Sequence, residues 1–415
     1  MIQRQDTIIG ELPNDWEVGL FSEDLKIQGR IGWKGYTKSD LVESGPIVIG
    51  GTEIKSSIHL RLENVKHLSR NKYDESPEIM LKHGDVLLVT RGNLGEVGYY
   101  HESYGEGTIN PSVIILKEFI GDSKFLFYYL ISRGGNHQVL SLTSGSSIPA
   151  IYQSEFYQLY YPRPSLIEQK AIAQVLTAFD DKIENLKAQN QTLETLAQTI
   201  FKEWFGKESD DWELVEIDIL IHVSSSKRIY SREYVTDGIP FYRSKEVIEL
   251  STKPDITTEL YISEERFKQI KEMYDVPQKG DILLTAVGTL GVPFQVRDYS
   301  PFYFKDGNLI WFKNFKNTIT SDFVYNWLKL KSTQDQLNMI SIGSTQKALT
   351  IASVKELKIP FIKDEIKRNN FYRLLKSNLD KVNHNLAHIQ SLTKTRDTLL
   401  PKLMSGELRV EGFGG

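Results

Sequence analysis

The sequence predicts two copies of a mixed α/β (α+β) domain, each followed by one long helix. Three observations lead to this fold class. The phrase GDVLLVTRGNLG at 84–95 returns as GDILLTAVGTLG at 280–291, 196 residues later. Short runs of β-branched and aromatic residues, bounded by Gly, Pro, Asn and Asp, occur in both halves and are typical of strands. After Ser165, apolar residues recur at spacings of four and three for more than four heptads, which indicates a coiled coil.

The repeat covers the whole chain. Four pairs of segments keep the same order at offsets of 196 to 198 residues: 15–17 and 211–213, 84–95 and 280–291, 108–117 and 304–313, and 144–162 and 342–360. Four ordered pairs indicate a duplication. The predicted parts are a first globular domain at 1–163, a helix at 164–206, a second globular domain at 207–360, and a helix with a tail at 361–415. Polar cap signals predict short helices at 122–133 and 320–337.

Length and composition exclude several classes of protein. A chain of 415 residues is expected to form two to four domains, and 40% apolar with 25% charged residues is average for soluble proteins. The sequence has no cysteine, which excludes disulfides and cysteine nucleophiles and fits a reducing cytoplasm. No segment approaches the roughly 18 apolar residues of a membrane span, and the start has no apolar signal core. We therefore expect a cytoplasmic protein. The net charge of −4 still allows a local basic surface.

Each globular domain runs into a long helix with an apolar seam. Ser165 and Glu168 have the spacing of a capping box at the start of the first helix. The predicted seam residues are Ile172, Leu176, Phe179, Ile183, Leu186, Asn190 and Leu193 in the first helix, and Leu379, Val382, Leu386 and Ile389 in its copy. Asn190 is the one polar residue of the first seam, and such residues often fix register or partner choice. The alternative is two separate helices, each packed on its own domain.

The repeated phrase itself predicts a strand, a tight turn and a second strand. Gly92, Gly95 and Gly98 do not have the spacing of a dinucleotide-binding or phosphate-binding loop. Glycine instead allows the positive φ angles of a turn. Arg91 and Asn93 are expected at the exposed tip, where Arg could read guanine and Asn could read adenine. A purely structural turn is an equally good interpretation.

Basic and aromatic residues gather in other loops of both halves and indicate DNA binding. Cations attract phosphates, amide and guanidinium groups read base edges, and a hydroxyl-rich turn before a helix can hold a phosphate. The candidate DNA-binding residues are Lys34, Tyr36, Lys38, Arg91, Asn93, Asn110, Ser146, Lys227, Arg228, Tyr230, Arg243, Lys245, Lys305, Thr345 and Lys347. Solvated polar loops and plain helix caps are the alternative.

No motif in the sequence predicts catalysis. The chain has no phosphate-binding lysine motif, no nucleophile elbow and no methyltransferase tetrapeptide. His384 and His388 have the spacing of a zinc-binding pair, but the residue after the first histidine is Asn385 instead of the glutamate of a metalloprotease. We interpret this segment as a solvated helix face, and we expect neither a catalytic residue nor a metal site.

Several phrases together resemble the specificity subunit of type I restriction–modification systems. They are LPNDW, GD[VI]LL followed by GxLG in both halves, IFKEWF, GSTQKALTIASVKELKIP and LPKLMSGELRV, and the resemblance covers residues 12–410. It implies two target-recognition domains, at 1–163 and 207–360, related by a pseudo-two-fold repeat. It also implies that the two long helices lie antiparallel as a spacer and dock methyltransferase subunits. The first half departs from the pattern, since it has GSSIPAI where the second has GSTQKAL.

The resemblance also implies how the protein works. Such a subunit reads a bipartite, asymmetric DNA target, with one half-site for each recognition domain, and catalyses nothing itself. Its partners are double-stranded DNA, two modification subunits and restriction subunits. S-adenosylmethionine, ATP and Mg²⁺ are used by those partners, and no cofactor is expected on this chain. The alternatives are a helix-mediated interaction protein, a DNA-binding protein outside restriction–modification, and an enzyme with recognition domains fused to it.

Overall fold

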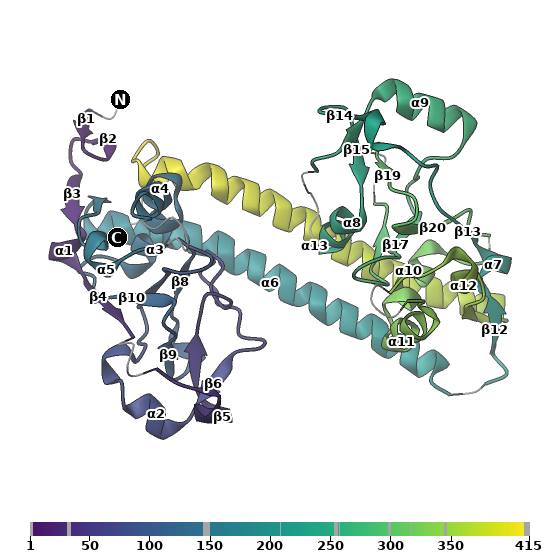
Figure 1. The fold of residues 1–415 in the computed structure, drawn as a ribbon, viewed down its shortest axis with the longest axis horizontal. Helices are drawn as coiled ribbons and strands as arrows, with labels where there is room; N and C mark the ends of the chain where they lie inside the picture. The colour runs from purple at the N-terminus through teal and green to yellow at the C-terminus, as the bar shows by residue number, and fades with distance from the viewer. Residues whose placement is uncertain are drawn as a thin grey trace. The chain divides into compact units, whose positions relative to one another are not determined.

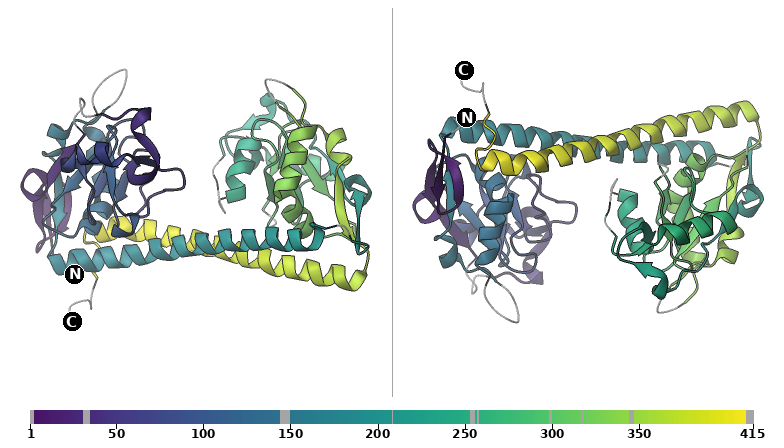
Figure 2. Two further views of the ribbon diagram at one scale, coloured as in Figure 1. Left: turned by 90° about the horizontal axis from the view of Figure 1, so that it is seen from below. Right: turned by 90° about the horizontal axis from the view of Figure 1, so that it is seen from above.

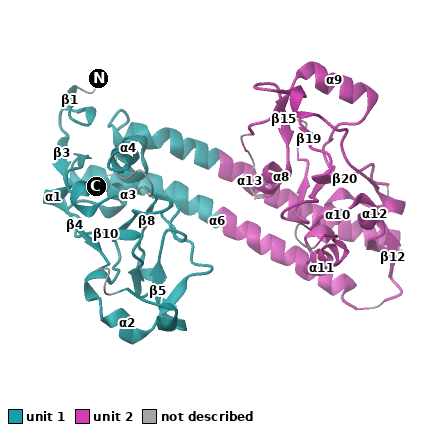
Figure 3. Ribbon diagram, in the orientation of Figure 1, with its two compact units in different colours: residues 1–185, 391–415 teal, residues 186–390 magenta. Residues whose placement is uncertain are grey.

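The computed structural model describes the chain except residues 1–2, 31–34, 144–149, 208, 253–255, 257, 298–299, 317, 344–346 and 411–415. The chain forms two compact units, shown in Figure 3. Unit 1 comprises residues 1–185 and 391–415, and unit 2 comprises residues 186–390. Each unit contains one globular domain and part of both long helices. Each long helix is therefore divided between the units, whereas the boundaries expected from the sequence keep it whole.

A four-stranded antiparallel sheet in the order β4–β10–β7–β8 forms the centre of unit 1 (Figure 1). Its strands are Lys26–Gly29 (β4), Val113–Lys117 (β10), Val86–Val89 (β7) and Val97–Tyr99 (β8). A second sheet contains Lys66–Leu68 (β6), Leu41–Ile49 (β5) and Gly107–Ile109 (β9), and β5 pairs with β9 in parallel. Two-stranded ladders join Arg4–Thr7 (β1) to Gly10–Pro13 (β2), and Glu17–Leu20 (β3) to Tyr160–Arg163 (β11).

Both faces of the central sheet are buried, which explains why β7 has the continuous apolar sequence VLLV. Val86 and Leu88 pack in one apolar cluster with the helical side of the domain, whereas Leu87 and Val89 pack in another with β5 and β9. The helices of this domain are Phe21–Asp24 (α1), Arg70–Asp74 (α2), Ser123–Ile131 (α3), Arg133–Ser141 (α4) and Gln153–Phe156 (α5), with 3-10 turns at Lys38–Asp40, Pro77–Ile79 and Glu102–Tyr104.

Unit 2 repeats this architecture. Its central sheet has the order β13–β20–β17–β18, with strands His222–Ser224, Leu309–Lys313, Ile282–Thr285 and Pro293–Gln295. A second sheet contains Tyr234–Val235 (β14), Tyr261–Ile262 (β16), Ile239–Tyr242 (β15) and Tyr303–Phe304 (β19), and β15 pairs with β19 in parallel, as β5 does with β9. Trp212–Glu216 (β12) pairs with Lys358–Ile362 (β21). The predicted duplication of a mixed domain is confirmed.

The helices of the second domain follow the order of those of the first with one addition, α8, which directly follows β15. They are Ile217–Leu220 (α7), Ser244–Thr252 (α8), Glu264–Met273 (α9), Ser321–Lys329 (α10), Lys331–Ile340 (α11) and Ile351–Lys355 (α12), with a 3-10 turn at Ser231–Glu233. The helix expected at 122–133 is confirmed by α3, which Asp122 caps. The single helix expected at 320–337 is wrong, because Leu330 adopts extended backbone and divides this segment into α10 and α11.

The two long helices are Leu166–Phe205 (α6) and Glu365–Met404 (α13), visible side by side in both views of Figure 2. In unit 1, Ile172 and Leu176 of α6 lie in one apolar cluster with Leu400 and Leu403 of α13. In unit 2, the cluster joins Phe201 of α6 to Phe371 and Leu375 of α13. Contacts between the helices pair higher residue numbers of α6 with lower residue numbers of α13. In unit 2, Asn190 bonds Asn385 and Leu193 bonds Asn378, so the helix segments run antiparallel. The expected long antiparallel helices are confirmed.

Burial along the helices follows the predicted seam closely in α6 and less closely in α13. Ile172, Leu176, Ile183, Leu186 and Asn190 are buried, and Phe179 and Leu193 are half-buried. In α13, Leu379, Val382, Leu386 and Ile389 are all half-buried, and the fully buried neighbours are Asn378 and Asn385. The buried side of α13 therefore includes Asn378 and Asn385, each one residue before a predicted seam leucine, Leu379 or Leu386.

A pair of asparagines lies in the buried line between the helices of unit 2. Asn385 donates from Nδ2 to Oδ1 of Asn190 at 2.8 Å, and Asn190 is 9% and Asn385 0% exposed. Asn378 also donates, to the backbone oxygen of Leu193 at 3.0 Å. The expectation of a solvated face is right for His384 and His388, which are exposed, but wrong for Asn385. Asn190 is therefore not an isolated polar residue of the seam.

We expect Asn190→Leu to lower the free energy of unfolding by about 1–3 kcal/mol, because it leaves the buried amide of Asn385 without its acceptor. The double variant Asn190→Leu/Asn385→Leu should be at least as stable as the single one and recover part or all of the loss, since two apolar side chains replace the pair. Urea unfolding of the full chain measures both. A double variant less stable than Asn190→Leu would contradict this role of the pair.

Candidate nucleic-acid interface

Four loops of unit 1 meet at one edge of its sheets. The amide of Asn110, after β9, donates to the carbonyl oxygen of Ile49 at the end of β5 at 2.9 Å. The amide of Thr90, after β7, donates to Ser112 at 2.8 Å, and Ile151 donates to Thr90 at 3.2 Å. These backbone bonds align the segments 49–53, 90–95, 110–112 and 150–151. We name them the loop edge of unit 1.

Unit 2 builds the same edge. Lys305, after β19, donates from its amide to the carbonyl of Tyr242 at the end of β15 at 2.9 Å. Ala286, after β17, donates to Asn308 at 2.8 Å, and Leu349 donates to Ala286 at 2.8 Å. The segments 242–246, 286–291, 305–308 and 347–349 therefore form the loop edge of unit 2. The strands that lead to it are labelled in Figure 1.

The repeated phrase forms the predicted strand, turn and strand in both edges. Gly92 and Gly95 have φ angles of 82° and 79°, and Gly288 and Gly291 have 80° and 75°, a region that strongly favours glycine. A side-chain amide from α4 or α11 supports each turn: Asn136 donates to Gly95 O at 3.3 Å, and Gln334 to Gly291 O at 2.7 Å. The same backbone turn thus carries different side chains in the two units, Arg91 and Asn93 in one and Val287 and Thr289 in the other.

In unit 1, Arg91, Asn93 and Asn110 come together at the loop edge. Arg91 bridges to Ala150 through its backbone, and the side chains of Arg91 and Asn93 are exposed with no hydrogen bond to other described residues. Asn110 is half-buried, and its Oδ1 accepts from Ser112 N at 2.9 Å and Ser112 Oγ at 2.6 Å. Its Nδ2 packs so closely over Gly50 that a Cβ there would lie 2.4 Å away.

The other candidates of unit 1 have different positions. Tyr36 is half-buried beneath the guanidinium of Arg30, 5.4 Å from its ring centre. Arg30 itself donates to Ile109 O at 2.8 Å and Thr108 Oγ1 at 3.0 Å, and burial lowers its pKa. It therefore holds the end of β9. Lys38 is exposed before the start of β5, at the opposite end of that strand from the loop edge. Lys34 and Ser146 lie outside the described residues.

In unit 2, five predicted cations meet around the ends of β15 and β19. Ser226 donates to Phe304 O at 2.7 Å, which brings the segment with Lys227 and Arg228 beside β19. Arg228 bonds Asp306 at 2.8 Å, and this hydrogen bond raises the pKa of Arg228. Arg243 and Lys245 follow β15 directly, and Lys305 follows β19, its parallel neighbour. Five cations therefore lie at or beside the loop edge of unit 2, together with the carboxylates of Asp306 and Glu246.

Exposed aromatic rings border these cations. The Nζ of Lys227 lies 4.9 Å from the ring centre of Tyr274, and Arg232 lies 5.4 Å from that of Tyr230. Both tyrosine side chains are exposed. Lys347 is exposed beside Ala348, which bridges to Val287 on the repeated turn. Thr345 lies outside the described residues.

Charge partners divide the basic residues of unit 2 into two kinds. Arg243 bonds the buried carboxylate of Glu246 at 2.6 Å, and this hydrogen bond raises the pKa of Arg243. Lys245 and Lys305 have no ion pair among the described residues, so their charges are available to phosphates. Glu246 was not among the predicted residues. A signal existed, because GGTE at 50–53 and RSKE at 243–246 place Glu53 and Glu246 at equivalent positions of the repeat.

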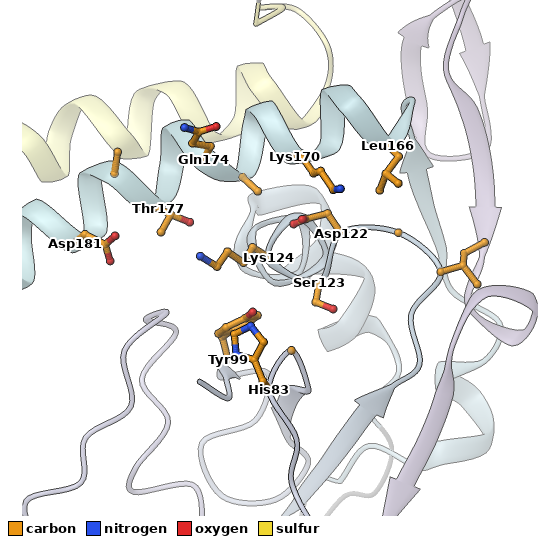
Figure 4. A pocket seen from close by; sticks show the side chains of 15 residues that line it. His83, Tyr99, Asp122, Ser123, Lys124, Leu166, Lys170, Gln174, Thr177 and Asp181 are labelled. Atoms are coloured by element: carbon orange, nitrogen blue, oxygen red, sulfur yellow. The ribbon is translucent and has the colours of Figure 1, made fainter. Parts of the chain in front are cut away.

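A polar crevice in unit 1 does not resemble an active site. Figure 4 shows it between α6 and α3, with Lys124 and Lys170 reaching into it above Tyr99 and His83. The carboxylate of Asp122 accepts from the amide of Phe125 at 2.9 Å and so caps α3.

In the part of the chain that the structure describes, no group of three metal-ligating side chains is assembled. Within the same residues, no helix is long and apolar enough to cross a membrane.

Comparisons with known proteins agree on one family. The family model described as the type I restriction modification DNA specificity domain matches residues 27–195 and 209–392. A type I restriction enzyme specificity subunit of Methanocaldococcus jannaschii is 27% identical, over 98% of this chain and 96% of that protein. A putative specificity subunit of Haemophilus influenzae is 24% identical, over 82% of this chain and 85% of that protein.

A solved structure supports the fold. The crystal structure of the type I restriction–modification S subunit from M. genitalium superimposes with a TM-score of 0.60 at 18% identity, covering 94% of this chain and 96% of that one. Together with the two family matches, one in each half, the duplicated domains and paired helices identify the protein. The chain belongs to the type I restriction–modification DNA specificity family and is a non-catalytic specificity subunit with two target-recognition domains.

Proposed function

We propose that this subunit reads a bipartite, asymmetric DNA sequence, with one half-site for each recognition domain. The observation that carries the proposal is the loop edge, which recurs on the same scaffold with different side chains. Unit 1 presents Arg91, Asn93 and Asn110. Unit 2 has Val287 and Thr289 at the first two positions, and Lys305 makes the backbone bond to the end of β15 that Asn110 makes to the end of β5. Because base readout depends on side chains at groove-facing tips, different tips should select different bases.

The long helices are proposed to set the gap between the half-sites. Two readers on one face of a duplex must lie about 34 Å apart, one helical turn, or somewhat more. A paired antiparallel coiled coil is stiff enough to hold such a distance, and α6 alone would be about 60 Å long at 1.5 Å per residue. The same helices are proposed to dock two modification subunits, to which restriction subunits add.

Chemistry is proposed to reside on the partner subunits. The modification subunits would use S-adenosylmethionine to methylate adenine, and the restriction subunits would use ATP and Mg²⁺. This chain would bind none of these cofactors and would act in the cytoplasm. Its contribution is to hold the duplex while a partner extrudes the target base from the stack.

Selection from a pool of random duplexes tests this function. The purified chain is mixed with its modification subunits, and bound DNA is sequenced after several rounds. We expect enrichment of two short, different sequences separated by a fixed gap. Enrichment of a single uninterrupted sequence, or of none, would contradict the proposal; the latter result would favour a helix-mediated interaction protein.

Exchange of residues 207–360 for the equivalent segment of another specificity subunit should change one half-site only. All described segments of the loop edge of unit 2 lie inside this exchange, so its reading surface moves as a whole. The other half-site and the gap should stay the same, because unit 1 and the two helices are retained. Sequencing of the methylated motif in the host measures the outcome. A change in both half-sites would show that the domains do not read independently.

A further inference from the structure

Arg243 differs from the other cations of the loop edge because a buried carboxylate holds it. Its Nε and Nη2 donate to Oε2 and Oε1 of Glu246 at 3.2 and 2.6 Å, and the backbone amide of Arg243 donates to Oε2 at 2.8 Å. The side chain of Glu246 is 4% exposed, whereas that of Arg243 is 31% exposed. The side of the guanidinium that faces Glu246 is thus fixed, and its other side is open to solvent.

The remaining donors of Arg243 suit a base edge better than a phosphate. A guanidinium carries five N–H groups, and Glu246 engages one side of the fork through Nε and Nη2. Nη1 has no hydrogen bond to any described residue, so it and the second hydrogen of Nη2 form a free pair. Two parallel donors match O6 and N7 of guanine in the major groove. Because the carboxylate offsets the positive charge, attraction to a phosphate is weakened while the hydrogen-bonding geometry is kept.

Unit 1 shows that the loop does not need this arginine. At the equivalent position, the amide of Gly50 donates to Oε2 of Glu53 at 2.8 Å, the same bond with the same length. The other oxygen of Glu53 accepts from Thr52 Oγ1 at 2.7 Å instead of from an arginine. Glutamate therefore builds the turn in both halves, and Arg243 is an addition that occurs in unit 2 alone.

We propose that Arg243 reads a guanine in the half-site of the second recognition domain, and that Glu246 positions it. This inference rests on the proposed function. The nearby Lys245 and Lys305, which have no ion pair among the described residues, contact phosphates on either side. Glu259 lies 3.8 Å from Nη2 but is 79% exposed, so it can turn away when DNA approaches.

The test compares sequence preferences of variants in complex with modification subunits, measured by selection from a pool randomised over both half-sites. Arg243→Ala should relax discrimination at one guanine position by roughly ten- to a hundredfold and leave every other position unchanged. Glu246→Gln keeps an acceptor for the turn but releases the guanidinium. It should weaken discrimination at the same position by a smaller factor.

Matched controls separate readout from charge and from folding. Lys245→Ala removes the adjacent exposed cation and should weaken binding to all sequences alike, with a salt slope lower by about one. Arg243→Gln/Glu246→Gln removes both charges without leaving the carboxylate unpaired. It should relax the same guanine position while keeping the thermal unfolding temperature of the parent chain.

Two results would overturn the inference and leave the proposed function intact. One is a uniform loss for Arg243→Ala across all sequences while the unmodified chain selects a split motif. The other is relaxation at a base other than guanine, or at no base. If the unmodified chain selects no split motif, the proposed function itself fails.

Discussion

Replacing Arg396 by alanine is expected to lower the free energy of unfolding by about 3–5 kcal/mol, the largest stability effect of any single change considered for this protein. Arg396 of α13 donates from Nη1 to Oδ1 of Asp180 on α6 at 2.5 Å. Tyr128 of α3 donates to the other oxygen of Asp180 at 2.7 Å. The side chain of Asp180 is only 5% exposed. Without Arg396, a buried carboxylate would keep a single hydroxyl as its partner in place of a cation.

The same three residues join the first recognition domain to both helices of unit 1. Burial raises the pKa of Tyr128 well above its usual range, so the phenol stays protonated and remains a donor to Asp180. The measurement is denaturant unfolding of the full chain. Arg373→Ala is the matched control, because Arg373 lies on the same helix, is exposed and, among the residues that the structure describes, bonds Asn370 alone, at 3.2 Å; it should change stability by less than about 0.5 kcal/mol.

A double variant shows whether charge burial causes the effect. Asp180→Leu/Arg396→Met removes both charges and leaves apolar side chains of similar size in the contact. It should be more stable than Arg396→Ala but remain about 1–3 kcal/mol below the parent chain, because the buried hydroxyl of Tyr128 loses Asp180 and keeps only the longer contact to Thr177 Oγ1 at 3.4 Å. If Arg396→Ala were no more destabilising than Arg373→Ala, the contact would have to be solvated in the folded protein, and its role in joining the domain to the helices would be lost.

Local patterns explain why much of the fold was predictable. The phrase at 84–95 combines a continuous apolar run with glycines at fixed offsets, and both properties act within a dozen residues. Its repetition at 280–291 predicted a second domain of the same topology without any knowledge of contacts. The seam of α6 was readable for the same reason, since helical periodicity is a property of neighbouring residues.

Contacts between distant segments were not predictable in this way. Arg396 lies beyond the predicted seam of the second helix, yet it pairs with Asp180, 216 residues earlier in the chain. Glu168 was expected to close a capping box with Ser165. Ser165 Oγ does accept from the amide of Glu168 at 3.3 Å, but the carboxylate of Glu168 instead bonds Trp16 at 3.0 Å and Arg409 at 2.8 Å.

The interface shows the same limit. Arg30 and Arg243 lie in similar basic, aromatic loops of the sequence, and the local difference is Glu246, three residues after Arg243. In the folded chain, the guanidinium of Arg30 donates to the carbonyl of Ile109 and the hydroxyl of Thr108. The guanidinium of Arg243 donates to Glu246 on one side and is open to solvent on the other. The structural role of Arg30 depends on partners 78 and 79 residues away, which no local pattern predicts, whereas the position of Arg243 depends on Glu246 three residues away.

Inserting one heptad into each long helix is expected to lengthen the gap between the half-sites, the largest functional change proposed here. Asn190 and Asn385 bond each other, so an insertion after Asn190 needs a matching one beside Asn385 to keep the helices paired. Seven residues add about 10 Å of helix and keep the seam in phase. That length corresponds to about three base pairs at 3.4 Å each.

The twist of DNA sets the expected size of the response. Each base pair turns the duplex by about one tenth of a full rotation, whereas a heptad turns a helix by about 20° short of two full turns. The lengthened subunit therefore cannot match both the distance between the half-sites and the rotation of the duplex between them. The preferred gap should grow by one to about three base pairs, while overall affinity falls. Binding to a series of duplexes, with identical half-sites and gaps varied one base pair at a time, measures the preferred gap directly.

The control is an insertion of seven residues into the connection 206–211, which joins α6 to β12. This insertion does not lengthen the helix pair, so it should leave the preferred gap unchanged. If the paired insertion also left it unchanged, the helices would not be the spacer, whatever else they bind.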